Sequence, residues 1–254
     1  MGARDVIDDL RAVITFFTII PIGGSHDVSR ALRNAWLAIL IVPVITGLLP
    51  GLLGYYLSLY VRNSLVIASI TYLLLLILTG LNHIDGFADV VDALMVRGSV
   101  EDRVRVLKDP HRGSASIAMV VLLIILAVSS LPNLMRVLWQ SLFMAEIVSK
   151  SACCLSGVFG KEPGHRGLGW QLTRYSKERV HLVIAALVVG LVITYLLLRF
   201  VGVIIALISM SLSVLLFMAL QGSLGGAVGD LYGFILEVSR VITLVLLSIV
   251  ISTI

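Results

Sequence analysis

Charged side chains are scarce in this sequence. Only 13% of its 254 residues are Asp, Glu, Lys or Arg, and 59% are hydrophobic, against about 25% and 45–50% in an ordinary globular domain. A chain this short cannot bury so much apolar surface in a soluble fold, because small domains leave much of their surface in water. The composition therefore excludes an ordinary soluble protein and predicts that the excess apolar surface faces lipid.

Cysteine is also scarce. The chain has only two, Cys153 and Cys154, which are adjacent in an apolar segment. Neighbouring cysteines rarely meet disulfide geometry, and two are too few for a structural zinc site, so we expect both to be reduced packing residues. The sequence lacks a recognisable signal peptide, a Ser-His-Asp triad, a dinucleotide-binding motif and any feature of nucleic-acid readout. Nucleic acid is therefore not an expected partner, and the first apolar span is expected to act as the targeting signal.

Seven stretches are apolar enough, and at about 20 residues long enough, to cross a bilayer. They cover residues 36–61, 65–81, 114–131, 137–159, 180–198, 201–220 and 234–254. Residues 6–20, ended by Pro21, Gly23 and Gly24, instead predict an amphipathic helix on the membrane surface, because charged residues interrupt their apolar pattern. The predicted fold class is an all-α polytopic membrane protein. About seven transmembrane helices follow an N-terminal interfacial amphipathic helix, in a single domain over residues 1–254.

Lysine and arginine are unevenly distributed over the connections. If successive spans cross the membrane in opposite directions, fourteen of the 19 Lys and Arg residues lie in connections on the side of the N-terminus. Only Arg62, Arg136 and Arg199 lie in connections on the opposite side. Cytoplasmic connections retain these residues during insertion. The pattern predicts a multi-pass cell-membrane protein with its N-terminus in the cytoplasm. The long connections on that side cover residues 82–113, 160–179 and 221–233, and we expect the active site among them.

The strongest chemical signal is an acidic run at residues 83–92. If this segment is helical, Asp85, Asp89 and Asp92 lie at i, i+4 and i+7 on one stripe. Like charges at this spacing repel and carboxylates near lipid are costly, so we expect a cation among them. Mg²⁺ fits, because it prefers oxygen ligands and joins carboxylates to substrate phosphates; a solvated acidic helix end is the alternative. His83 points away from this stripe on a continuous helix and stays a candidate base, ligand or cap.

A second candidate segment follows at residues 108–113. Lys108 and Arg112 can bind phosphate oxygens, and Asp109 can complete the metal site. Pro110 and Gly113 predict a turn that returns these groups toward the acidic run. Alone, the segment is a positively charged flank of a span; beside three aspartates it is a candidate phosphate clamp.

A glycine-rich segment at residues 222–230 precedes the last span. Its backbone N–H groups can cradle an anion, although close helix packing explains such glycines equally well. The candidate substrate-binding residues here are Gly225, Gly226, Gly229 and Asp230. Two other pairs, Glu146 with Lys150 and Glu237 with Arg240, have the spacing of ion pairs within one helix, and we interpret them as structural.

These motifs together resemble the cobalamin synthase family, the adenosylcobinamide-GDP ribazoletransferases. The family's acidic motif is matched at Thr79, Gly80, His83, Asp85, Gly86, Ala88, Asp89 and Asp92. Its later motifs are matched at Lys108, Asp109, Gly113, Gly225, Gly226, Gly229, Asp230, Gly233 and Glu237. An early Phe17-Thr18-x-x-Pro21 and the loop 167–169 are also similar. Val228 and Ser116 depart from the pattern, standing where Thr and Gly are expected.

The resemblance implies a Mg²⁺-dependent transfer that completes the nucleotide loop of cobalamin. A hydroxyl of α-ribazole, or of its 5′-phosphate, attacks the cobinamide-linked phosphate of adenosylcobinamide-GDP, and GMP leaves. The implied metal ligands are Asp85, Asp89, Asp92 and Asp109. The implied catalytic residues are Asp92 and His83, and Lys108 and Arg112 would hold the pyrophosphate.

Two alternatives stay open. A CDP-alcohol phosphatidyltransferase is another membrane enzyme with Asp-Gly and paired aspartates, but its motif is longer and has Ala-Arg where this chain has Ala88-Asp89. An ion-coupled transporter also carries carboxylates within its spans, although it predicts acids across the whole bilayer depth. The sequence does not determine the oligomeric state, and a homo-oligomer stays possible.

Overall fold

The computed structural model describes residues 3–23 and 27–253, and every regular element within these ranges is a helix. In chain order they are α1 (Ala3–Phe17), α2 (Val28–Arg33), α3 (Ala35–Pro43), the π-helix η1 (Val44–Leu48), α4 (Leu49–Ser58), α5 (Ser64–Leu78), α6 (Asn82–Met95), α7 (Val100–Val106), α8 (Ser114–Ser130), the 3₁₀-helix η2 (Leu131–Val137), α9 (Leu138–Phe159), α10 (Leu168–Glu178), α11 (Val180–Gln221), the 3₁₀-helix η3 (Gly222–Leu224) and α12 (Gly229–Ser252). The all-α prediction is confirmed. Gly24 and Ile254, at the ends of two predicted segments, lie outside the described residues.

Several helices are long and apolar enough to cross a membrane. Four segments meet this condition among the described residues: Ala35–Ser58, Ser114–Phe159, Val180–Leu224 and Gly229–Ser252. A fifth is added if α5 and α6, which meet at a bend of 91°, form one broken span. The chain is therefore a multi-pass membrane protein by length and composition, while the count of seven crossings stays a prediction.

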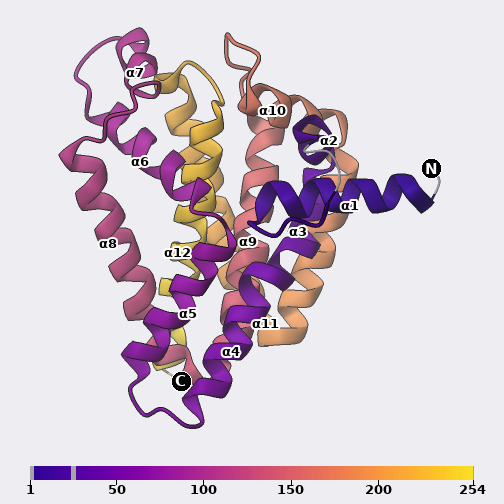
Figure 1. Cartoon of the computed structure of the whole chain (residues 1–254), viewed down its shortest axis with the longest axis vertical. Coiled ribbons are helices and arrows are strands. Elements are labelled where there is room, and N and C mark those ends of the chain that lie inside the picture. Colours follow the sequence, from indigo (N-terminus) through magenta and orange to yellow (C-terminus); the bar gives the residue numbers. More distant parts are fainter. Residues whose placement is uncertain (1–2, 24–26, 254) are drawn as a thin grey trace.

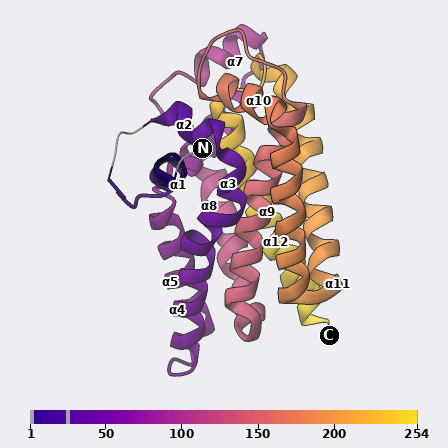
Figure 2. The ribbon, with the colours of Figure 1, turned by 90° about the vertical axis from the view of Figure 1, so that its right-hand side faces the viewer.

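The segment built on α11 is too long for one crossing, and its path reverses. Leu198 and Arg199 have non-helical backbone angles in the middle of α11. A Cβ on Gly202 would lie only 3.2 Å from the Thr194 side chain, whereas residues eight apart in a straight helix are separated by about 12 Å. Figure 2 shows the two halves of α11 side by side.

The connections gather at two ends of the bundle. One end holds α7, α10 and the segment before α12, and the other holds the α4–α5 connection and the C-terminus (Figure 1). Arg62 and Arg136 line one hollow at the second end, and Arg136 lines another with Leu198, next to Arg199. The three basic residues that the sequence assigned to the poorly charged side therefore share one end.

Helix α1 lies across the bundle instead of along it: it runs sideways in Figure 1 and is seen end-on in Figure 2. Its Asp9 accepts a hydrogen bond of 2.6 Å from Arg30 Nε of α2, and Asp9 raises the pKa of the Arg30 guanidinium. Val6 and Ile7 on the same helix are exposed. The helix ends at Phe17, three residues before the predicted boundary.

Helix α9 is the centre of the fold and packs against α3, η1, α4, α10, α11 and α12. Its approach to η1 and α4 is very close. A Cβ on Gly47 would lie 2.7 Å from the Leu142 carbonyl oxygen, and one on Gly51 would lie 2.5 Å from Trp139 Cα. Small residues at such contacts let membrane helices pack tightly without a hydrophobic driving force.

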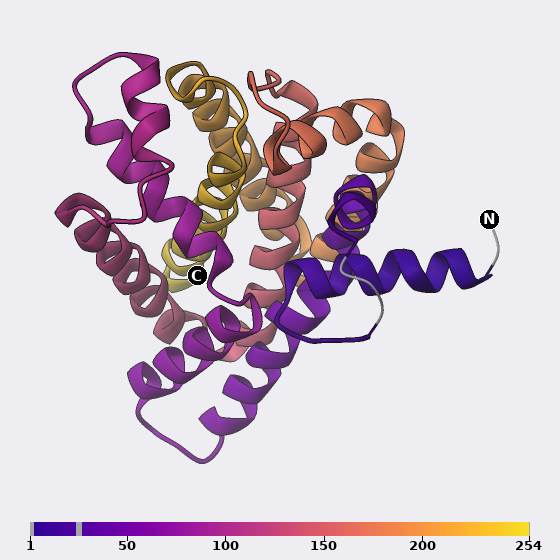
Figure 3. The same cartoon turned by 45° about the horizontal axis from the view of Figure 1, so that its top comes forward.

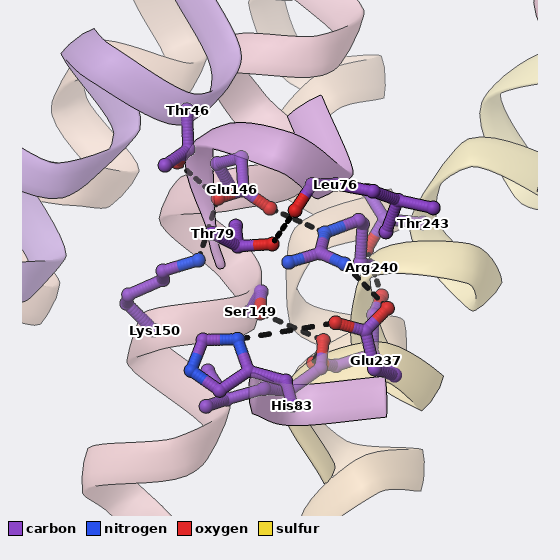
Figure 4. Close-up of polar contacts among 12 residues, drawn as sticks. Thr46, Leu76, Thr79, His83, Glu146, Ser149, Lys150, Glu237, Arg240 and Thr243 are labelled. Atoms are coloured by element: carbon purple, nitrogen blue, oxygen red, sulfur yellow. Dashed lines mark hydrogen bonds and ion pairs between the residues drawn. The ribbon is translucent and has the colours of Figure 1, made fainter. Parts of the chain in front are cut away.

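A cluster of four charged side chains is buried at the interface of α9 and α12 (Figure 4). Lys150 donates to Glu146 over 2.5 Å, and Arg240 donates both to Glu146 across the helix interface and to Glu237 one turn away. Thr46 of η1 also donates to Glu146. The two predicted ion pairs are confirmed, and Arg240 joins them into one network of two positive and two negative charges.

Removing one member of this charge network is expected to destabilise the fold strongly, because an unpaired buried charge remains. For Glu146→Ala we expect a loss of about 3–5 kcal/mol, measured as the unfolding free energy in mixed detergent micelles. Arg174→Ala, which breaks the exposed ion pair with Glu178, is the control and should change stability little. A Glu146 variant as stable as this control would contradict the role assigned to the network.

Candidate active site

The bend between α5 and α6 positions the acidic run. Gly80 (φ 69°) and Leu81 (φ 60°) both adopt the left-handed conformation, and α6 starts directly afterwards at Asn82. The run is helical, as predicted, and its aspartates lie along one side of α6. Because the helix begins before Asp85, His83 stays on a different face from the aspartates.

Two of the three aspartates on α6 form ion pairs with the same arginine side chain. Arg112 Nη2 donates to Asp85 Oδ1 over 3.0 Å, and Arg112 Nη1 pairs with Asp89 Oδ1. Asp85 is well exposed, whereas Asp89 is largely covered. The predicted return of the segment around Pro110 toward the acidic helix is therefore confirmed. The pair of carboxylates has the oxygen donors that Mg²⁺ prefers and already surrounds a positive charge, so it fits a divalent cation.

Asp92 is engaged differently. Its Oδ2 accepts from the backbone N–H of Gly113 over 2.7 Å, and its Oδ1 accepts from that of Ser116 over 3.1 Å. Asp92 thus caps the first turn of α8, where unpaired N–H groups and the helix dipole favour a carboxylate. Ser116, one of the two departures from the family pattern, is buried here and donates its hydroxyl to the Gly113 carbonyl.

Asp109 and Lys108 lie in the exposed connection before α8. Asp109 accepts a 2.9 Å hydrogen bond from the backbone N–H of His111 and contacts the His111 ring at 2.8 Å. These hydrogen bonds hold the pKa of the Asp109 carboxyl below its usual value. Across residues 3–23 and 27–253, no three His, Cys, Asp or Glu side chains are grouped as a metal site. The structure therefore brings together Asp85 and Asp89 of the four predicted ligands.

Helices α6 and α12 touch at two glycines. A Cβ on Gly86 would lie 2.8 Å from the Asp230 carbonyl oxygen and 3.3 Å from Gly233 Cα, and one on Gly233 would lie 3.3 Å from the His83 carbonyl oxygen. This contact places Asp230, in the first turn of α12, next to the acidic helix. Figure 3 shows the magenta α6 and the gold start of α12 side by side at this end.

The glycine-rich segment is a folded connection. Gly225 and Gly226 have positive φ, the Gly226 N–H donates to the Gln221 carbonyl, and the Ala227 N–H donates to the Lys161 carbonyl, both over 2.8 Å. The last span was predicted to start at residue 234, but α12 starts at Gly229. Gly229 and Asp230 consequently belong to a helix N-terminus, where free N–H groups favour anions.

His83 and Glu237 face each other on the opposite side of α6. His83 Nδ1 lies 3.9 Å from Glu237 Oε1 (Figure 4), and neither atom has a hydrogen-bond partner among the described residues. His83 also lines a cavity of about 350 Å³ between α1, α6, α10 and α12. Most residues of this cavity's wall carry no chemical motif that the sequence could reveal, although Phe17 and the loop 167–169 are similar to family motifs.

Fold and site together define a class: an all-helical, multi-pass membrane protein that collects paired carboxylates, an arginine and a helix N-terminus at one end of its bundle. Such groups suit a phosphorylated substrate.

Residues 9–248 match the family model described as Cobalamin-5-phosphate synthase, so the chain belongs to this family. The resemblance stated from the sequence is confirmed, and with it the prediction of a membrane-bound transferase of cobalamin biosynthesis. The match also disfavours both the phosphatidyltransferase and the transporter alternatives.

Curated relatives carry a consistent name. An "Adenosylcobinamide-GDP ribazoletransferase" of Pyrobaculum aerophilum is 34% identical, over 91% of this chain and 92% of its own length. The protein of the same name from Pyrobaculum calidifontis is 36% identical over 91% and 95%, and that from Pyrococcus furiosus is 31% identical over 94% and 99%. No solved structure matches the chain significantly.

The glycine contact between α6 and α12 provides a test of the site. Gly86→Ala places a methyl group 2.8 Å from the Asp230 backbone, so the two helices must separate and we expect turnover to fall sharply with membrane insertion retained. Gly222→Ala is the matched control, since a Cβ there meets nothing within 4 Å. Equal activity of the two variants in a membrane-fraction assay would argue against a site at this contact.

Proposed function

We propose that this chain is a Mg²⁺-dependent adenosylcobinamide-GDP ribazoletransferase. It would join α-ribazole, or α-ribazole 5′-phosphate, to adenosylcobinamide-GDP and release GMP, the last step in assembly of the nucleotide loop of cobalamin. The observation that carries the proposal is the meeting of Arg112 with Asp85 and Asp89 beside the N-terminus of α12. The family match and the names of the relatives supply the substrates.

Binding of the pyrophosphate is assigned to Arg112, Lys108 and the start of α12. Arg112 carries five N–H donors, two of which reach Asp85 and Asp89. Arginine binds phosphate oxygens bidentately and lysine acts as a point charge. The glycine-rich connection Gly225–Gly226 holds Gly229 and Asp230 at the helix N-terminus, where N–H groups favour anions.

Asp85 and Asp89 would hold Mg²⁺, with substrate phosphates and water as the remaining ligands. When bound, the ion would neutralise phosphate charge and align nucleophile with leaving group. Asp109 lies in the exposed connection that also carries Arg112, and it stays a candidate further ligand. Asp92 is less suited to this role, because both of its oxygens accept hydrogen bonds from α8.

In the proposed reaction the ribazole hydroxyl oxygen forms a bond to the cobinamide-linked phosphorus. The bond from that phosphorus to the bridging oxygen breaks, and this oxygen leaves with GMP. Of the two candidate catalytic residues, His83 is favoured over Asp92 as the acceptor of the hydroxyl proton. His83 lines the cavity, whereas both carboxylate oxygens of Asp92 already accept hydrogen bonds from the start of α8.

We also propose seven crossings with the site in the cytoplasm. Each of the segments Ser114–Phe159 and Val180–Leu224 would cross twice, with turns at η2 and at Leu198–Arg199. The end that bears the site also bears most of the basic residues outside the spans, which cytoplasmic connections retain. Helix α1 would lie in the membrane surface on this side, in the cell membrane, and a homo-oligomer stays open.

Purified protein in detergent micelles, incubated with Mg²⁺, adenosylcobinamide-GDP and α-ribazole or its 5′-phosphate, should release GMP, and removal of Mg²⁺ by EDTA should abolish this release. Asp89→Asn should remove turnover while the protein still inserts, because one of the two proposed metal ligands loses its charge. Glu178→Gln, an exposed acid on α10 outside the site, should remain active. No GMP from folded wild-type protein would refute the proposal.

Cysteine labelling tests the orientation. The native Cys153 and Cys154 are buried, so a single introduced cysteine dominates the reaction with a membrane-impermeant maleimide. In intact spheroplasts, Arg62→Cys should react and Arg105→Cys, on exposed α7, should react only after the membrane is opened. The reverse labelling pattern would place the site outside the cytoplasm.

A further inference from the structure

The cavity beside His83 has walls unlike the acidic stripe on the other side of α6. Its volume is about 350 Å³. Most of its apolar wall comes from three helices: Phe16 and Phe17 of α1, Leu168 and Leu172 of α10, and Tyr232 and Leu236 of α12. Large aromatic and aliphatic side chains of this kind favour a flat aromatic ligand.

Polar groups gather where the cavity meets α6 and the start of α12. Asn82, His83 and Asp230 line it there, and the His83 ring lies 6.5 Å from the Phe17 ring, centroid to centroid. An apolar pocket with a few converging polar groups is typical of small-molecule sites, where the polar groups fix the ligand's orientation. The ligand should therefore be aromatic at one end and hydroxylated at the other.

The cavity adjoins the proposed phosphate site at Gly86 and Asp230. Gly86 lines the cavity and directly follows Asp85, which pairs with Arg112. Asp230 lines it as well, and its backbone lies against Gly86, since a Cβ on that glycine would be 2.8 Å from the Asp230 carbonyl oxygen. A ligand in the cavity would thus present its polar end to the groups that we assign to the pyrophosphate.

The volume of the cavity decides which of the two proposed substrates, the corrinoid or the ribazole, can enter it. Ligand pockets span about 300–1,000 Å³, and this cavity is near the lower limit, too small for a corrin macrocycle with its side chains. A nucleoside with one fused aromatic base is far smaller. Resting on the proposed function, we propose that this cavity is the acceptor pocket, which binds the aromatic base and ribose of the ribazole while the corrinoid stays outside it.

The assignment gives α1 a second role. Phe16 and Phe17 belong to the helix that lies across the bundle, and Arg30 of α2 holds that helix through Asp9 over 2.6 Å. The acceptor pocket is consequently closed on one side by α1. The choice of the aromatic base that the ribazole carries would then depend on α1 and α10, away from the proposed metal ligands.

Two variants change the pocket in opposite senses. Leu172→Trp fills it, and Phe16→Ala, at a partly exposed position, enlarges it and removes an aromatic wall. Each should raise the Kd of α-ribazole about tenfold or more, measured by equilibrium dialysis with the full chain in detergent, and leave the Kd of adenosylcobinamide-GDP within about twofold. The matched controls, Leu196→Trp and Phe200→Ala on exposed positions of α11, should leave both Kd values unchanged.

The outcomes separate this inference from the proposed function. Wild-type affinity for α-ribazole in both pocket variants, or a loss confined to adenosylcobinamide-GDP, would overturn the acceptor pocket even if the wild type releases GMP. Absence of α-ribazole binding to the folded wild type would overturn it too. Conversely, α-ribazole binding that both pocket variants weaken, without GMP release by the wild type, would support the pocket and refute the transfer.

Discussion

The ion pair between Glu146 of α9 and Arg240 of α12 is the contact on which the rest of the structure depends. Charges in the middle of a membrane protein are tolerated when they are paired, and here Lys150 and Glu237 complete a neutral set of four. The geometry of these bonds fixes how far along α9 the helix α12 lies. That position in turn sets Gly233 opposite α6. The charges buried in the bundle interior therefore determine how α6 and α12 meet at the candidate site.

The acidic helix follows from a second constraint, the sharp bend after α5. A straight continuation of that helix would carry the aspartates of the acidic run further along the span, where carboxylates are costly. The left-handed pair Gly80 and Leu81 turns the chain by 91° instead. Helix α6 then runs over the end of α12, and the connection after α7 returns Arg112 to neutralise Asp85 and Asp89.

Local patterns in the sequence predicted much of this arrangement. The spacing of Asp85 and Asp89, the turn that returns Arg112 and the ion pair of Glu237 with Arg240 all follow from helical geometry or turn chemistry, which depend on neighbouring residues. The bond from Arg240 to Glu146 could not be predicted, because these residues are 94 positions apart and meet only through the packing of α12 on α9. The use of Asp92 to cap α8 was hidden for the same reason.

On the proposed function, the two faces of α6 would allow one helix to serve two unlike ligands. The stripe with Asp85 and Asp89 faces a basic connection and suits phosphates and a divalent ion. The face with His83 and Gly86 meets α12 and an apolar cavity, which suits an aromatic group. Because residues on a helix have fixed angular positions, the distance between the two binding regions is set by α6 itself. A transfer reaction requires that its two substrates meet at a defined distance. The two regions approach each other at the start of α12, where Asp230 lines the cavity and Gly86 follows Asp85 on α6.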